Sequence, residues 1–317
     1  MAGPADPKSE QRLRRSRATR PMTNQEEPMS KVDEVERDEE QVEGDLTTVF
    51  GDDKGKDPAS SLAKMLSILD LFTQANPRWS TNDIIDYLGT SRSTGYRYIK
   101  GLHAVGLLAA VGNGFYMLGP RIVELDLRIR ECDPLYIASK GVLEQLVDAT
   151  GHSALLCMLF SNSVLCIREH LAPFSPENMF SRGQRRPLFK GAMSKVILSY
   201  LPPHRLRSIY AKNPLKVADA KLGNNWDDFR ENLGKIRKDG YVMTLGEFNP
   251  NVYGVGAPVF NEEKLIIGSI GVAWQKEELP EVDVAKTILA VKRAAREITN
   301  RMMSGTGGMA LPPRAVG

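Results

Sequence analysis

The stretch that decides the fold covers residues 80–108 and reads STNDIIDYLGTSRSTGYRYIKGLHAVGLL. Its first part predicts a short helix that Ser80 caps, with Asp83 at the capping-box position. The apolar side chains of this helix are Ile84, Ile85 and Leu88. Gly89 ends the helix, because glycine readily takes the left-handed backbone conformation found at helix ends. Ser91 then caps a second helix, so the stretch predicts two helices joined by a tight turn.

The second helix has two chemically different faces. Its apolar residues recur at helical spacing and are expected to pack inward: Tyr98, Ile99, Leu102 and Val105. Cations, hydroxyls and one further tyrosine gather on the opposite side: Arg92, Ser93, Tyr96, Arg97 and Lys100. Such a face suits the major groove of DNA, where arginine reads guanine edges and the other side chains hold phosphates. The alternative interpretation is an ordinary solvated helix, since short basic faces are common.

The flanking segments complete a small domain. Residues 107–118 read LLAAVGNGFYML, in which Gly112-Asn113-Gly114 predicts a hairpin turn between two short strands. Upstream, apolar residues predict one more amphipathic helix: Leu62, Met65, Leu66, Leu69 and Phe72. Helix, turn, helix and hairpin together predict a winged helix-turn-helix.

Three segments between residues 61 and 126 resemble a known family. SLAKMLSILDLF, IIDYLGTSRSTGYRYIKGLHAVGLL and GFYMLGPRIVEL look like the DNA-binding domain of the IclR family of bacterial transcription regulators. The resemblance implies double-stranded DNA as a partner. The candidate DNA-contacting residues are Ser91, Arg92, Ser93, Thr94, Tyr96, Arg97, Lys100 and Asn113.

Two glycines depart from the usual pattern of a recognition helix. Gly95 and Gly101 each cost about 1 kcal/mol relative to alanine inside a helix. Gly95 stands where the family usually has an apolar residue. It either permits close approach of a neighbouring helix or leaves the recognition helix partly ordered until DNA binds.

Bulk properties narrow the class of protein. The chain has 317 residues, enough for two domains, and a net charge of +3, so affinity for nucleic acid must come from a local patch. No apolar run approaches the roughly 20 residues of a membrane helix, and the polar N-terminus lacks the apolar region of a secretory signal. Three cysteines argue against a disulfide framework. These features predict a cytoplasmic protein.

The predicted organisation has five parts. An unstructured extension covers residues 1–57, the winged domain 58–119, a linker helix 120–132, an effector-binding domain 133–303 and a flexible tail 304–317. The extension has a basic part, with five arginines between positions 12 and 20, and an acidic part at 33–53. Its basic part either contacts DNA phosphates or is a tail without a specific function. Met22 and Met29 are alternative translation starts.

The linker helix carries a narrow apolar stripe of Ile122, Leu125 and Ile129. Resemblance to the family makes it the helix that positions the DNA-binding heads of two subunits. The alternative is a helix that packs on its own second domain.

The second domain alternates predicted strands and helices. Helices are expected at 135–150, 191–201, 205–212, 226–239 and 282–302, and strands at 153–160, 164–170, 241–247, 252–260 and 265–274. Adjacent strands with helices set apart predict an antiparallel sheet with helices packed on it. The resemblance implies a GAF-like effector domain, so the overall fold class is α+β with two domains.

Two further segments resemble the family's effector pocket. RPLFKGAMSKVILSYL and GEFNPNVYGVGAPVF carry residues whose counterparts line that pocket, and the helix start at 191–193 offers backbone N–H groups to a carboxylate. The candidate effector-binding residues are Gly191, Ala192, Met193, Thr244, Glu247, Gly254, Gly271 and Ala273. The glycines could instead be bulges or packing positions.

The ligand is expected to be a small organic acid. Where the family places Asp, Cys and Ser side chains around small carboxylates, this chain has Thr244, Gly254, Gly271 and Ala273. Fewer donors and more room favour a larger, flatter or less polar acid than glyoxylate or pyruvate, such as an aromatic acid.

The positions of the cysteines and histidines bear on redox, metal-binding and catalytic sites. A two-residue turn at Ser161-Asn162 would place Cys157 opposite Cys166, either as a redox pair or as two buried thiols. The histidines show no metal-ligand spacing, and no nucleophile elbow, P-loop or dinucleotide-binding motif is present. We therefore expect no catalytic site, no metal and no cofactor.

The sequence thus predicts a homo-oligomeric regulator, a dimer or a tetramer, that binds a pseudo-palindromic operator and responds to an organic acid. The alternative is a constitutive DNA-binding protein whose second domain serves only oligomerisation.

Overall fold

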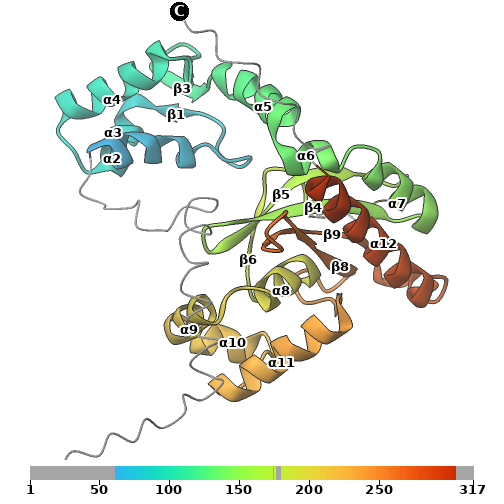
Figure 1. Cartoon of the computed structure of the whole chain (residues 1–317). Coiled ribbons are helices and arrows are strands. Elements are labelled where there is room, and N and C mark those ends of the chain that lie inside the picture. Colours follow the sequence, from blue (N-terminus) through green and yellow to red (C-terminus); the bar gives the residue numbers. More distant parts are fainter. Residues whose placement is uncertain (1–60, 174, 176–179, 305–317) are drawn as a thin grey trace, which may run out of the picture. The chain divides into compact units, whose positions relative to one another are not determined.

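The computed structural model describes residues 61–173, 175 and 180–304 (Figure 1). The predicted N-terminal extension, and the predicted tail apart from Ser304, lie outside these residues.

The first elements form a small helical domain with a three-stranded sheet. They are α2 (Ser61–Ser67), η2 (Ile68–Leu71), β1 (Trp79–Ser80), α3 (Thr81–Leu88), α4 (Arg92–Ala104), β2 (Leu108–Ala110) and β3 (Phe115–Leu118). The sheet has the strand order β1-β3-β2 and is antiparallel. β1, a two-residue strand beside Tyr116, was not predicted because two residues carry no periodicity.

Local capping determines where α3 and α4 begin. The Ser80 hydroxyl accepts the Asp83 N–H at 3.2 Å and donates to the Asp83 carboxylate at 2.6 Å. The Ser91 hydroxyl accepts the Thr94 N–H at 3.4 Å, and Gly89 between the helices has a φ of 58°. The predicted helix-turn-helix is confirmed.

The core of this domain corrects three apolar assignments. Ile84, Ile85, Leu88, Tyr98, Ile99 and Leu102 are buried as predicted, whereas Leu62, Leu66 and Val105 are 67%, 51% and 59% exposed. The helix tightens into 3-10 geometry after Ser67, so Ile68 and Leu71 take the buried positions. Val105 lies beyond the last residue of α4, at the C-cap of the helix.

α3 and α4 pack closely at Gly95. A Cβ atom built on Gly95 would lie 2.5 Å from Cγ1 of Ile85. Gly101, on the same helix, would place its Cβ 3.8 Å from the Met65 sulfur, an ordinary contact. The close-approach interpretation of Gly95 is therefore confirmed.

The hairpin turn and the next helices follow the predicted order with one break. Gly112, Asn113 and Gly114 all have positive φ, as the predicted turn requires. α5 (Arg121–Cys132) comes next and has no buried residue; of its apolar stripe, Ile122 is half-buried, and Leu125 and Ile129 are exposed among the described residues. The single helix expected at 135–150 is two helices, α6 (Pro134–Ala138) and α7 (Val142–Thr150), because Gly141 between them has a φ of 80°.

A six-stranded antiparallel sheet forms the centre of the second domain, in the order β6-β5-β4-β9-β8-β7. Its strands are β4 (Ser153–Phe160), β5 (Ser163–His170), β6 (Arg185–Pro187), β7 (Val242–Leu245), β8 (Val252–Phe260) and β9 (Ile266–Gln275). β6 was not predicted, because its three residues become a strand only by pairing with β5. The predicted antiparallel sheet with packed helices is confirmed.

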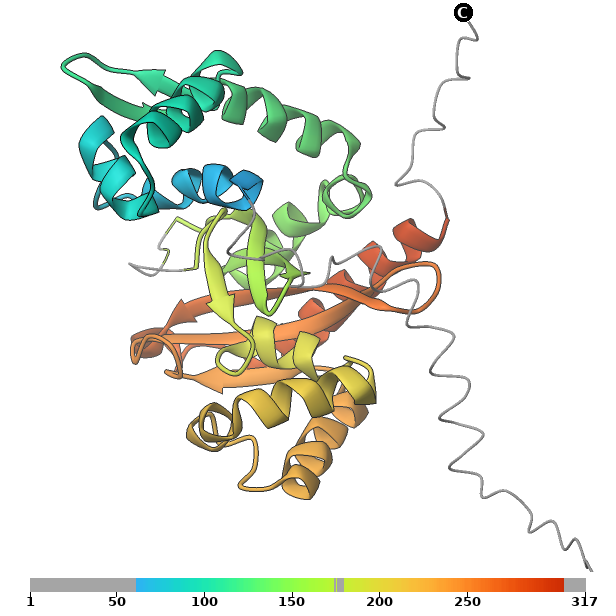
Figure 2. The same ribbon diagram turned by 90° about the vertical axis from the view of Figure 1, so that its left-hand side faces the viewer.

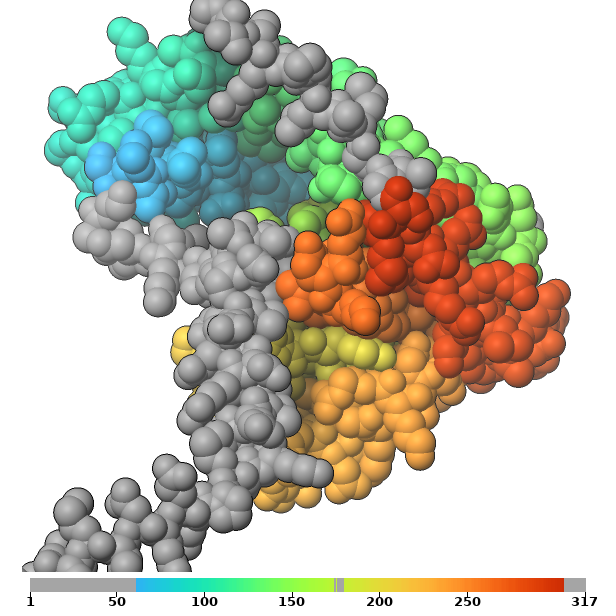
Figure 3. Space-filling model, in the orientation of Figure 1, coloured from blue at the N-terminus to red at the C-terminus, as the bar shows by residue number. Residues whose placement is uncertain are grey.

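Helices cover both faces of this sheet. They are α8 (Ala192–Ser199), α9 (Pro203–Lys212), α10 (Pro214–Asp219), α11 (Trp226–Asp239) and α12 (Val284–Met303), with η3 (Lys276–Glu278) after β9. α8 packs on β8 and β9, and α12 packs on the opposite face of the same strands beside α7 (Figure 2). The residues of α12, red in Figure 3, reach the surface of the molecule. α10 was not predicted.

The two central cysteines face each other as the predicted turn requires. Cys157 and Cys166 are register partners on β4 and β5, both are buried, and both are free thiols. Burial raises the pKa of the Cys157 thiol well above its usual value. A buried protonated thiol is a poor nucleophile, which favours the interpretation of two structural thiols.

Replacing Gly95 with alanine should destabilise the protein, whereas the same change at Gly101 should stabilise it. At Gly95 the new methyl overpacks against Ile85, a cost of about 1–3 kcal/mol that exceeds the gain in helix propensity of about 1 kcal/mol. At Gly101 only the propensity gain of about 1 kcal/mol operates. Denaturant unfolding of the two variants measures both free energies, and an equal stabilisation by both would contradict the packing account.

Candidate functional site

The exposed face of α4 has the predicted chemistry. Arg92, Ser93, Tyr96, Arg97 and Lys100 are all exposed, as is Asn113 at the tip of the hairpin. None of the three cations forms an ion pair with a carboxylate of the described residues. The face is therefore free to meet phosphates and base edges.

Two of the candidate DNA-contacting hydroxyls are engaged within the helix. The Ser91 hydroxyl caps α4 and donates to the Thr94 hydroxyl at 3.0 Å, and Thr94 is half-buried. A role for either residue in DNA binding would compete with this cap, since one hydroxyl offers a single donor.

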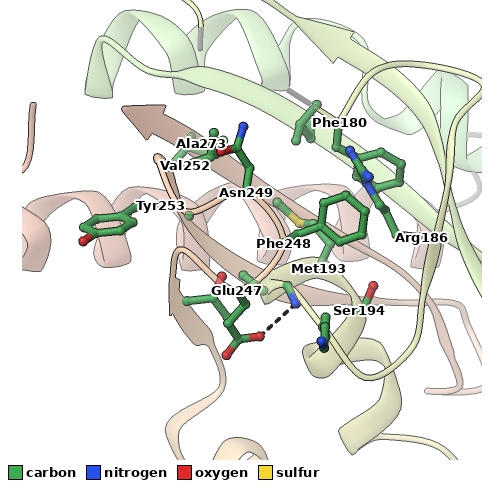
Figure 4. Close-up of a pocket in the computed structure, with 17 residues that line it drawn as sticks. Phe180, Arg186, Met193, Ser194, Glu247, Phe248, Asn249, Val252, Tyr253 and Ala273 are labelled. Carbon is green, nitrogen blue, oxygen red and sulfur yellow. Dashed lines mark hydrogen bonds between the residues drawn. The ribbon is translucent and has the colours of Figure 1, made fainter. Parts of the chain in front are cut away.

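The second candidate site is a cavity between α8 and the sheet (Figure 4). Its volume is about 90 Å³, several times the roughly 10–15 Å³ that one water requires. The walls come from β4, β7, β8 and β9, the start of α8, the loop after β7, and two residues near β6. Elements distant in the sequence thus meet at one small-molecule-sized space.

Seven of the eight predicted effector-binding residues line this cavity. Thr244, Gly254 and Ala273 lie in one row across the sheet, because Thr244 pairs with Gly254 and Gly254 pairs with Ala273. The others are Gly191, Ala192, Met193 and Glu247. The row presents one hydroxyl and two small residues, so this wall is largely apolar.

Gly271 does not line the cavity, which corrects that assignment. A Cβ on Gly271 would lie 2.2 Å from Cε of Met193 and 2.0 Å from the Val255 carbonyl oxygen. The Met193 methyl already occupies the space that the missing side chain leaves. Gly271 therefore lets α8 approach the sheet, the packing alternative stated for these glycines.

Both carboxylate oxygens of Glu247 have partners within the protein. One carboxylate oxygen accepts the Gly191 N–H at 3.0 Å, and the other forms an ion pair with the Lys195 ammonium. Lys195 also donates to the Ala220 carbonyl at 3.1 Å. The Gly191 N–H is thus not available to a ligand, but those of Ala192 and Met193 have no acceptor among the described residues.

The sequence interpretation missed two charged residues of the cavity: Lys190, which pairs with Asp219 at 2.7 Å, and Arg186. Its guanidinium lies 3.5 Å from the ring centroid of Phe248 and 5.0 Å from that of Phe180. Burial lowers the pKa of the guanidinium from its usual value, and no described carboxylate pairs with Arg186. A cation without a counter-ion among the described residues therefore faces a largely apolar cavity.

The sequence contained weak signals for these three residues. Arg186 opens the segment RPLFKGAMSKVILSYL, and Phe248 follows Glu247 in the other pocket segment. Phe180 lies before the unpredicted strand β6. Nothing local distinguished them from surface residues, because their meeting depends on the pairing of β6 with β5 and on the loop after β7.

The described residues were also compared with the requirements of a metal site and of a membrane span. No group of three or more His, Cys, Asp or Glu within them is arranged to hold a metal ion. None of their helices combines the length and apolar character needed to cross a membrane.

Family models match both domains. The IclR helix-turn-helix domain matches residues 61–112, and the bacterial transcriptional regulator IclR C-terminal domain matches residues 132–300, more than half of the chain. The HTH-type transcriptional regulator KipR of Bacillus subtilis is 21% identical over 242 residues, which cover 76% of this chain and 96% of KipR. The regulator KdgR of Dickeya chrysanthemi is 22% identical, with 79% and 82% covered.

Solved structures share the fold. The IclR transcriptional regulator of Alicyclobacillus acidocaldarius has a TM-score of 0.66 at 22% identity, covering 76% of this chain and 97% of its own. An IclR homologue of Microbacterium hydrocarbonoxydans, solved with 4-hydroxybenzoate, has a TM-score of 0.64 at 20% identity, covering 77% and 100%. With a winged helix-turn-helix followed by the matched C-terminal domain, this chain belongs to the IclR family and is a DNA-binding transcriptional regulator.

Proposed function

We propose that a small aromatic acid, bound in the cavity beside Arg186, controls the affinity of this regulator for its operator. The observation that carries the proposal is Arg186 itself, a partly buried cation with no described counter-ion at an apolar cavity. Keeping an uncompensated charge there is costly, and a ligand carboxylate would remove that cost.

The rest of the cavity favours an aromatic body on the ligand. Phe180 and Phe248 offer ring faces beside Arg186, and Leu155, Val252 and Val272 add apolar wall. The free N–H groups at the start of α8 offer a second anchor for an anion. The 4-hydroxybenzoate bound by the Microbacterium homologue belongs to this chemical class.

On the DNA side, we infer that the exposed face of α4 enters the major groove and that Asn113 approaches the backbone. A homodimer would present two such helices to a pseudo-palindromic operator with half-sites about one helical turn apart. A tetramer would engage two such sites. The acid acts by binding one arrangement of the DNA-binding heads more tightly than the other.

Replacing Arg186 with alanine should raise the dissociation constant for 4-hydroxybenzoate about ten-fold or more, because a charge-assisted contact contributes roughly 1.5–3 kcal/mol. Calorimetric titration of the full-length protein gives this constant. Arg185→Ala is the matched control, since Arg185 belongs to the same strand but lies over Phe160, outside the cavity. Equal affinities in both variants, or tight binding of glyoxylate and pyruvate alone, would refute the proposed site.

Replacing Arg92 or Arg97 with alanine should weaken operator binding. If the replaced residue reads a base, its loss should cost about 1–3 kcal/mol of binding free energy on the operator and little on scrambled DNA. If it contacts a phosphate, its loss should weaken binding to both DNAs and reduce the salt slope by about one. Gel-shift titrations distinguish the two outcomes. Arg230→Ala, an exposed arginine of α11, serves as the control. Unchanged affinity in both α4 variants would contradict the assignment of α4 to the groove.

A further inference from the structure

The segment 180–186 leads into β6 and includes its first two residues; we name it the β6 turn. Phe180 and Arg186 at its ends line the cavity. Arg182 between them does not, and its guanidinium contacts Asp126 of α5. One short piece of chain therefore touches both the proposed ligand site and the helix that follows the winged domain.

Arg182 is fixed from several sides. Both terminal nitrogens donate to the Asp126 carboxylate, one of them at 3.1 Å, in a bidentate pair. Its Nε donates to the Ile167 carbonyl at 2.6 Å, and its backbone N–H donates to Glu169 at 3.3 Å. The planar fork of arginine suits this geometry, whereas a lysine could not make the paired contact.

The pair adds to the few other contacts of α5, which packs against α6 and whose Arg121 N–H donates to the Gly106 carbonyl at 3.1 Å. None of its residues is buried. Among the described residues, Asp126 forms the only side-chain hydrogen bonds between α5 and the rest of the chain; its other partner, Arg130, is on α5 itself. The hydrogen bonds from the Arg182 guanidinium also hold the pKa of Asp126 below its usual value.

The β6 turn is itself tightly bonded. The Gly183 N–H donates to the Cys166 carbonyl at 2.8 Å, and the Cys166 N–H donates to the Gln184 carbonyl at 3.1 Å. Arg185 and Arg186 then pair with β5. These hydrogen bonds and strand pairs make the backbone from Arg182 to Arg186 one continuous bonded stretch.

We propose that Arg182 is a positioning residue that transmits ligand occupancy of the cavity to α5 through Asp126. This proposal rests on the proposed function of the cavity. A ligand that draws Arg186 and the ring of Phe180 toward itself shifts the β6 turn, and the bidentate pair moves Asp126 with it. The acid then binds the protein more tightly with α5 in one placement than in the other. Such a difference in affinity is what coupling between two sites requires.

Hydrogen exchange on the full-length protein without ligand tests the tether alone. In Arg182→Ala, amides of α5 around Asp126 should exchange about three- to ten-fold faster than in the unmodified protein, since a charge-assisted contact of this exposure contributes roughly 1 kcal/mol. Arg185→Ala removes a neighbouring charge and should leave α5 unchanged. Arg130→Ala removes the other partner of Asp126 but keeps the bridge, and should have the smaller effect. Equal α5 exchange in the Arg182 and Arg185 variants would overturn the proposal.

DNA titrations with and without 4-hydroxybenzoate test the transmission. In Arg182→Ala the ratio of the two operator dissociation constants should fall toward one, while calorimetry still finds acid affinity within about three-fold of the unmodified protein. The charge-reversed pair Asp126→Arg with Arg182→Asp should restore much of the ratio. A full ratio in Arg182→Ala would overturn the proposal. If no aromatic acid binds the unmodified protein, the proposed function fails instead, and the exchange experiment still decides whether Arg182 holds α5.

Discussion

The carboxylate of Glu247 is the interaction on which the proposed site depends. It joins the start of α8 to the loop after β7, by accepting the Gly191 N–H and pairing with Lys195. The Lys195 side chain is only 8% exposed, so an isolated ammonium there would be expensive, and the pair with Glu247 and the Ala220 carbonyl offset that cost. Glu247 lines the cavity and Lys195 belongs to α8, so the pair ties the loop after β7 to the helix whose start forms another wall of the cavity.

Close packing of α8 on the sheet is the second constraint. Gly256 and Gly271 leave no space for side chains: their Cβ atoms would meet the backbone of Ala192 and Met193, and the methyl of Met193. The helix therefore lies on the strands, and the cavity opens only beside its N-terminus. Thr244, Gly254 and Ala273 keep the side chains on that wall small, so the bulky side chains that line the cavity include Arg186 and the two phenylalanines.

Local signals predicted most elements, and tertiary contacts explain what was missed. Capping serines, the break at Gly89 and the turn at residues 112–114 define the winged domain without distant partners. Leu62 and Leu66 were assigned inward from helical periodicity alone, which cannot register a change to 3-10 geometry after Ser67. Gly271 was assigned to the cavity because a glycine in a strand signals close approach, yet the approaching group is Met193. Arg186 was not predicted as a cavity residue because β6 forms only by pairing with β5.

The most direct test of the account is the linkage between acid and DNA. An operator fragment selected with the protein would be titrated by fluorescence anisotropy, with and without saturating 4-hydroxybenzoate, at one salt concentration. The account predicts that the operator dissociation constant changes by about 5- to 150-fold, the usual range of coupling between two sites. Identical constants, at acid concentrations where calorimetry finds the cavity occupied, would contradict the account. Such a result would instead support the alternative, a constitutive DNA-binding protein whose affinity for DNA does not respond to the acid.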